Sequence, residues 1–190
     1  MDAAEAVGRA HDRSGGPTAG CNPAHRCAPL AMATIVPDDE LAGCALREAG
    51  LTHQHPLAGD VAAVAVLCRA LIRGEPWSDA LATARMGRLP ATIEALDGGH
   101  SCPLSPGGYA PEVLRAAVHF VARHDAFADA LSDSLDFAGP ANYCPVLVGA
   151  MAGARWGAAV IPVQMLLDCD LLGRVRDDSD RLANEWEEMG

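Results

Sequence analysis

A tyrosine, an asparagine and an aspartate stand where a polar loop passes into an apolar helix. Residues 134–145 carry Asp136, Asn142 and Tyr143, and the Gly- and Ala-rich residues 146–154 follow. Loop donors beside a helix N-terminus suit the binding of an anion or a sugar. Tyr143 can give a proton or a hydrogen bond to a substrate, or it can fill a pocket as a buried ring. Asp136 can orient a water, or it can be a solvated residue on a helix surface.

A histidine and an arginine lie side by side in a second candidate loop, residues 20–30, which is polar around Asn22 and apolar at its end. The imidazole of His25 and the guanidinium of Arg26 can bind a phosphate or activate a water, and a structural role is the alternative. All 14 basic side chains of the chain are arginines. This excludes Schiff-base and lysine–phosphate mechanisms and leaves Arg26 and backbone N–H groups as anion receptors.

Two further histidines and the cysteines give no metal-binding pattern. His53 and His55 are two residues apart, so one helix face does not carry both, and no Cys-x-x-Cys pair supports zinc. We therefore expect capping or turn roles for both histidines, no metal and no other cofactor. Cys144 lies at a helix N-terminus, which lowers the pKa of a thiol, but Pro145 and the apolar surroundings favour an inert one. The cysteines in apolar helical patterns, with Cys169 among them, are expected to be reduced and buried.

Apolar spacing and capping residues predict an all-α chain. We expect residues 1–19 to be a mobile lead-in with a short helix at 2–10, and residues 20–190 to form one helical domain. The longest loop, residues 97–109, contains Gly108 and Tyr109 and has the Gly- and Pro-rich composition of a functional loop. The expected helices of the domain are 30–36, 39–49, 56–73, 77–87, 90–96, 111–124, 126–135, 146–154, 161–172 and 174–188.

The composition limits both the class of protein and its partners. With 190 residues, of which 50% are hydrophobic and 4% aromatic, the chain can form one core of Ala, Leu and Val between closely packed helices. A net charge of −11 disfavours nucleic acid and anionic membranes as partners. No signal-peptide or transmembrane pattern occurs, so we expect a cytoplasmic protein that binds a small molecule.

Four spaced stretches resemble the ADP-ribosylglycohydrolase family, which includes the activators of dinitrogenase reductase. Residues 149–154 match its Gly-Ala-x-Ala-Gly-Ala helix, residues 26–30 its Arg-x-Ala-Pro loop, and residues 51–56 its Leu-Thr-His-x-His-Pro segment. Residues 108–109 and 125–131 match its Gly-Tyr and Asp-Ala-Phe elements. The four motifs in the right order are more specific than any one of them, and they imply a single-domain helical bundle of this family.

The resemblance also implies a pocket where three loops meet. At this pocket we expect Tyr143, His25 and Asp136 to be the catalytic residues. We expect the ligand to be bound by Asn22, Arg26, His53, Gly108, Tyr109 and Asn142. Pro140, Asn142 and Tyr143 stand where the family has two metal-binding carboxylates and a hydroxyl, and its N-terminal metal motifs are not matched. The resemblance therefore covers a truncated form of the family that lacks the metal-binding acids.

We accordingly expect a metal-independent, repurposed enzyme that acts on a nucleotide-like or other polar small molecule, with a specialised biosynthetic pathway as one setting. The alternative is a non-catalytic regulatory protein that binds ADP-ribose or a nucleotide, and a third is that a second chain supplies the metal-binding half. An apolar face left uncovered would favour a homodimer, with the Gly- and Ala-rich surfaces of residues 56–72 and 146–160 in contact.

Overall fold

The computed structural model describes residues 3–13, 15–16, 18–98, 103–167 and 169–187, and within these the chain is all-α. The described residues form no β-strand, and a single isolated antiparallel bridge joins Gly20 to Tyr109. The expected fold class is confirmed. The helices are α1 (Ala3–Arg13), α2 (Asn22–Arg26), α3 (Ala28–Met32), α4 (Asp38–Gly50), α5 (Pro56–Ala62), α6 (Val64–Ile72), α7 (Trp77–Arg85), α8 (Pro90–Leu96), α9 (Ala110–Arg123), α10 (Phe127–Ala138), α11 (Tyr143–Trp156) and α12 (Leu172–Glu187).

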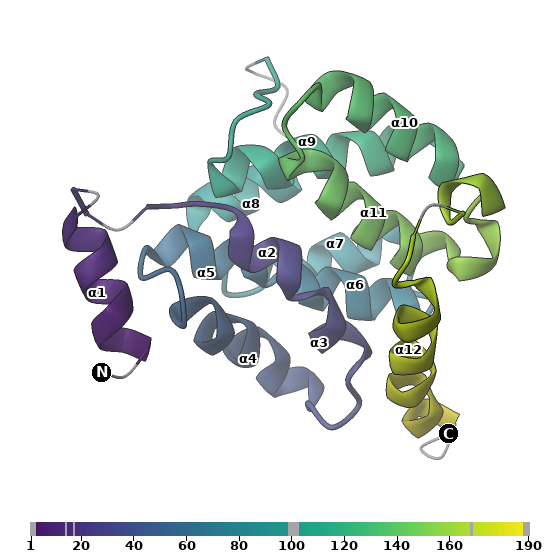
Figure 1. Cartoon of the computed structure of the whole chain (residues 1–190), viewed down its shortest axis with the longest axis horizontal. Coiled ribbons are helices and arrows are strands. Elements are labelled where there is room, and N and C mark those ends of the chain that lie inside the picture. The colour runs from purple at the N-terminus through teal and green to yellow at the C-terminus, as the bar shows by residue number, and fades with distance from the viewer. Residues whose placement is uncertain (1–2, 14, 17, 99–102, 168, 188–190) are drawn as a thin grey trace.

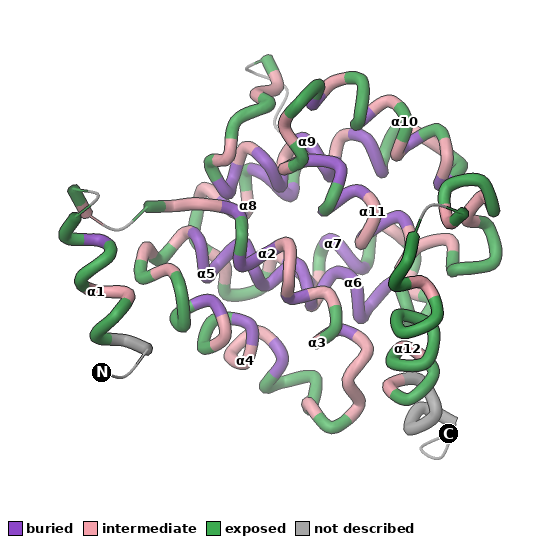
Figure 2. Tube along the Cα trace, in the orientation of Figure 1, coloured by how far each residue is buried: buried purple, intermediate pink, exposed green. Residues whose placement is uncertain are grey.

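Helices α6, α9 and α11 form the centre of the bundle. Helix α6 packs against α3, α4, α7 and α11, while α9 packs against α5, α8, α10 and α11. The buried side chains of this centre are mostly Ala, Leu and Val, as the composition predicts. Figure 1 shows α1 and α12 at opposite sides of the bundle, and Figure 2 shows that both are largely exposed. Closely packed small side chains therefore position the loops at the ends of α2, α9 and α11.

Most helix starts lie where proline and capping residues predict them. Pro56 and Pro90 occupy the first turns of α5 and α8, and Nδ1 of His55 caps α5 by accepting a hydrogen bond from Leu57 N at 3.2 Å. The structural role expected for His55 is confirmed. Gly139 ends α10 with φ of 55°, a conformation that favours glycine.

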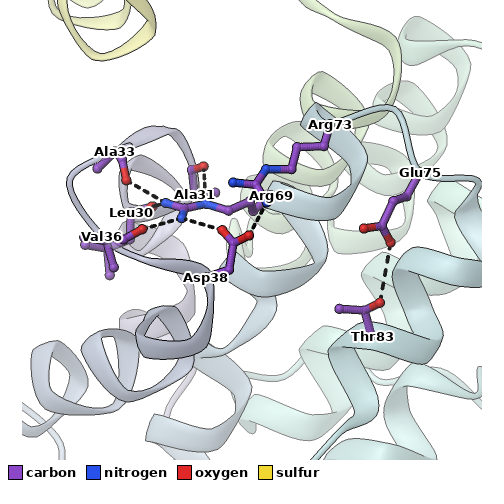
Figure 3. Close-up of polar contacts among 9 residues, drawn as sticks. All are labelled: Leu30, Ala31, Ala33, Val36, Asp38, Arg69, Arg73, Glu75 and Thr83. Atoms are coloured by element: carbon purple, nitrogen blue, oxygen red, sulfur yellow. Dashed lines mark hydrogen bonds and ion pairs between the residues drawn. The ribbon is translucent and has the colours of Figure 1, made fainter. Parts of the chain in front are cut away.

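The helix expected at residues 30–36 is wrong, because α3 ends at Met32 and the chain becomes extended at Ala33. The cause is a buried arginine of α6, Arg69, whose side chain is 4% exposed. Its guanidinium donates hydrogen bonds to backbone carbonyl groups that would accept bonds within the helix if α3 continued, as Figure 3 shows. Arg69 donates hydrogen bonds to the carbonyl oxygens of Ala31 (3.1 Å), Leu30 (2.8 Å), Ala33 (2.6 Å) and Val36.

Arg69 also connects to the first residue of α4. Its Nη1 lies 3.0 Å from Oδ1 of Asp38, and Arg73 pairs with the other oxygen of the same carboxylate. Partial burial alone would raise the pKa of Asp38, but the hydrogen bonds and charges of the two arginines outweigh it and hold that pKa below its usual value. The cluster joins the end of α3, the start of α4 and the middle of α6.

The long helix expected at residues 56–73 is two helices, separated by a turn at Ala63 whose N–H bonds to Asp60 O and Val61 O. The break allows α5 to pack on α2, α4 and α9 while α6 packs on α3, α7 and α11. Both helices are buried within the monomer, so residues 56–72 do not supply the interface expected of them.

The helix expected at residues 161–172 is replaced by short 3₁₀ turns at Ala158–Val160 and Val163–Met165. Val163, Met165 and Leu167 are exposed here. Helix stability depends largely on packing an apolar face, and this segment packs few of its side chains. Cys169 is also exposed, which corrects its expected burial.

No helix among the described residues is long and apolar enough to cross a membrane.

Candidate functional site

Tyr143 begins α11, three residues earlier than the expected helix, and its ring lies on the backbone of Gly108. A Cβ atom added to Gly108 would lie 3.2 Å from Cζ of Tyr143, so a side chain at this position would push the ring away. His25 of α2 is a second neighbour of Tyr143, and the two rings are stacked at 24° with centroids 6.3 Å apart. His25, Gly108 and Tyr143, from three segments distant in the sequence, therefore meet at one face, which we call the His25–Tyr143 face.

Backbone hydrogen bonds hold this face together. Cys21 N donates to Gly108 O at 3.2 Å, and Ala110 N donates to Ala19 O at 2.8 Å. These bonds flank the bridge between Gly20 and Tyr109. The segment before α2 and the segment before α9 are thus joined along the backbone, which fixes His25 and Gly108 relative to one another.

Arg26 lies next to His25 but is held by groups of the protein. Its Nε pairs with the Glu48 carboxylate, and its Nη2 donates to Thr52 Oγ1 at 2.6 Å and to Glu48 O at 3.4 Å. Because the charge of Glu48 neutralises that of Arg26, the structure gives Arg26 a part in joining α2 to the end of α4.

His53 extends the same network. Its Nδ1 lies 2.9 Å from Thr52 Oγ1, and a Cβ atom on Gly20 would lie 3.1 Å from its Nε2, so the imidazole packs closely on the glycine backbone. Burial lowers the pKa of His53, and the positive charges of Arg26 and His11 lower it further. The network Glu48–Arg26–Thr52–His53 therefore borders the His25–Tyr143 face.

The other expected site residues lie outside this contact set. Asn22 and Asn142 are exposed at the starts of α2 and α11, and Asn142 makes no side-chain cap. Asp136 is exposed near the end of α10, and no hydrogen bond or ion pair joins it to His25 or Tyr143 among the described residues. Tyr109 is 44% exposed and borders a groove between α8 and α9.

Cys144 follows Tyr143 and is buried in the core. Burial raises the pKa of its thiol to about 12, so the thiol stays protonated near neutral pH. The inert thiol is the alternative that the structure supports.

His25 is half-buried at this face. Burial lowers the pKa of His25, and a hydrogen bond with the backbone of Tyr143 opposes that change. Its Nε2 is buried and has no hydrogen-bond partner among the described residues. A neutral imidazole with an unused ring nitrogen can accept a proton or bind a polar group of a ligand.

The lowered pKa values of His25 and His53 predict how stability depends on pH. Because the unfolded chain binds protons on these residues more readily than the folded chain, the free energy of unfolding should rise as the pH increases toward about 6.5. Urea titrations at several pH values measure this slope. The variant His25→Gln should reduce it, and an unchanged slope would show that His25 titrates alike in both states.

Sequence reasoning missed Glu48 as part of this region. Its Oε2 is buried without a partner among the described residues, while Oε1 pairs with Arg26. The available signal was weak, because a glutamate in the last turn of an amphipathic helix normally faces solvent.

Comparisons with known proteins agree with the fold and the motifs. The model of the ADP-ribosylglycohydrolase family matches residues 2–190. A solved structure described as an ADP-ribosylglycohydrolase-related protein complex superposes with a TM-score of 0.78 at 28% sequence identity. The match covers 88% of this chain and 60% of that one, and no curated protein matches significantly. The chain belongs to the ADP-ribosylglycohydrolase family.

Proposed function

We propose that the chain is a metal-independent hydrolase that cleaves an N-glycosidic bond in a nucleotide-like small molecule at the His25–Tyr143 face. The observation that supports this most is the stacked pair itself, in which a histidine of lowered pKa keeps an unused, buried ring nitrogen. In the proposed step His25 takes a proton from the attacking water, whose oxygen bonds to the sugar carbon. The carbon–nitrogen bond breaks as Tyr143 donates its proton to the leaving nitrogen.

The donor set at the start of α11 is the reason to propose a reaction without magnesium. Magnesium prefers hard oxygen ligands and is generally bound through one or two carboxylates. Pro140 offers no side-chain ligand, Asn142 offers an amide, and the ring of Tyr143 packs on Gly108. No cluster of three His, Cys, Asp or Glu side chains fit for a metal occurs within the described ranges. These residues do not replace the two metal-binding carboxylates and the hydroxyl that the family has at the same positions.

Magnesium at about 1 mM should therefore raise the melting temperature of the protein by less than about 1 °C, because an ion that does not bind the native state cannot stabilise it. Thermal denaturation with and without magnesium or manganese measures the shift. A saturable rise of several degrees would overturn metal independence.

The second candidate is a non-catalytic protein that binds ADP-ribose or a related nucleotide. The buried, protonated Cys144 favours it, since the face has no thiolate nucleophile. Calorimetric titration with ADP-ribose, combined with an assay for released base, separates the two candidates. Saturable binding without turnover supports the second.

We also propose a homodimer, with its interface on the segment after α11 rather than on residues 56–72. Large apolar side chains are exposed there at Val160, Val163, Met165, Leu167, Leu171 and Val175. Exposed apolar surface of this extent commonly marks an interface, and a stable dimer buries more than about 2,000 Å². Analytical ultracentrifugation at micromolar concentration should show a dimer, and Leu167→Asp should yield monomers. A wild-type monomer would contradict the proposal.

A further inference from the structure

A groove of about 340 Å³ lies between α7, α8 and α9, and none of its residues belongs to the His25–Tyr143 face. Its volume is in the lower range for small-molecule sites. The lining combines aromatic, basic and aliphatic side chains: Trp77, Leu81, Arg85, Leu96, Asp97, Gly98, Val118, His119, Ala122 and Arg123.

The charge of this groove is opposite to that of the whole chain. Arg85 and Arg123 face a single lining carboxylate, Asp97, in a protein whose net charge is −11. Nη2 of Arg85 pairs with Asp97 at 2.6 Å. Arg123 is exposed in the last turn of α9, and no ion pair with it occurs in the described part of the chain. The groove therefore keeps one uncompensated positive charge, which attracts an anion.

A second observation points to a missing acceptor. The Nε atom of Arg85 is buried and has no hydrogen-bond partner among the described residues. Leaving a buried donor unsatisfied is costly, particularly on a charged group. Nη2 of the same guanidinium is already used by Asp97 and by Leu96 O at 3.4 Å. An acceptor atom of a ligand that reaches Nε would satisfy this donor.

One wall of the groove is the indole ring of Trp77. The guanidinium of Arg155 lies 5.3 Å from the ring centroid of Trp77 and 4.7 Å from that of Trp156. Arg155 is itself fixed by a 2.6 Å hydrogen bond from Nη1 to Val121 O. Such cation–π contacts orient the indole, and a fixed indole beside aliphatic side chains suits a planar apolar group.

We propose that this groove binds a small planar organic anion, with its ring against Trp77 and its carboxylate or phosphate group between Arg85 and Arg123. The site does not depend on the function proposed for His25 and Tyr143. A carboxylate and a phosphate present the same chemistry to two guanidinium groups, so the probes are chosen to distinguish them.

Isothermal titration calorimetry with four probes tests the proposal: 2-naphthoate, 2-naphthyl phosphate, the neutral 2-naphthamide and inorganic phosphate. We expect saturable binding of at least one naphthyl anion, and the tighter of the two identifies the acidic group. Naphthamide should bind about tenfold more weakly or worse because it lacks the charge. Inorganic phosphate should also bind more weakly, because it has no ring to place on Trp77.

Two charge-matched variants locate the binding. Arg123→Gln should weaken the preferred naphthyl anion about tenfold, while Arg176→Gln on the exposed α12 removes the same charge and should leave the affinity unchanged. Arg85→Gln should also weaken binding. No binding of either naphthyl anion at about 5 mM, equal binding of the amide, equal binding of inorganic phosphate, or equal affinity of the two charge variants would each overturn the proposal.

Discussion

Replacing Arg69 by methionine should lower the free energy of unfolding by about 3–5 kcal/mol, because it leaves several carbonyl groups without their hydrogen-bond donor, at about 1–3 kcal/mol for each group that stays buried. The side chain is 4% exposed and holds four carbonyl oxygens and the Asp38 carboxylate. Methionine fills a similar volume but satisfies none of these acceptors. For a domain of this size the loss corresponds to a fall in melting temperature of about 10 °C.

The neighbouring Arg73 provides a matched control for this prediction. It pairs with the same carboxylate, but its side chain is 41% exposed, so Arg73→Met should cost less than about 1 kcal/mol. Urea denaturation of both variants measures the difference. Equal losses would show that the shared partner Asp38, and not the carbonyl groups around Arg69, gives the cluster its stabilising effect.

Arg69 also shows why sequence reasoning located most helices and failed at α3. Proline positions and apolar spacing are local signals. They predicted the bounds of α8 and, to within two residues, those of α4, α9 and α12. The end of α3 is set by a guanidinium 36 residues away in the chain from Ala33. An arginine in an apolar helix gives no local sign of which carbonyl groups it will bind.

The candidate site was predictable to the extent that the family motifs carry it. The motifs indicated that His25, Gly108 and Tyr143 belong to segments that meet, and the structure places Tyr143 beside both His25 and Gly108. They did not indicate that Glu48 would neutralise Arg26, since that pairing depends on how α2 packs on α4. Side-chain pairing across helices is set by tertiary packing, and residue types alone do not encode it.

Replacing Tyr143 by phenylalanine should lower turnover about a hundredfold or more if the chain is a hydrolase, because that is the usual effect of losing a general acid. The change removes one oxygen and keeps the ring, so the packing on Gly108 and His25 is retained. Stability should therefore change little. Release of free base or amine from ADP-ribosyl-arginine, NAD and nucleosides, followed by chromatography, measures turnover.

Thr83→Val is the matched control, because it also removes a hydroxyl, one that bonds to Glu75 at 3.4 Å on α7 rather than at the His25–Tyr143 face. It should leave turnover unchanged.

The pH profile adds a test of the proposed pair: the rate of wild type should fall as pH drops through the lowered pKa of His25, because the base becomes protonated. Full activity of Tyr143→Phe would remove Tyr143 as the acid, and a rate independent of pH in that range would remove His25 as the base. A wild-type chain that turns over none of these substrates but binds ADP-ribose, with an affinity that changes in Tyr143→Phe, would assign the same face to binding alone.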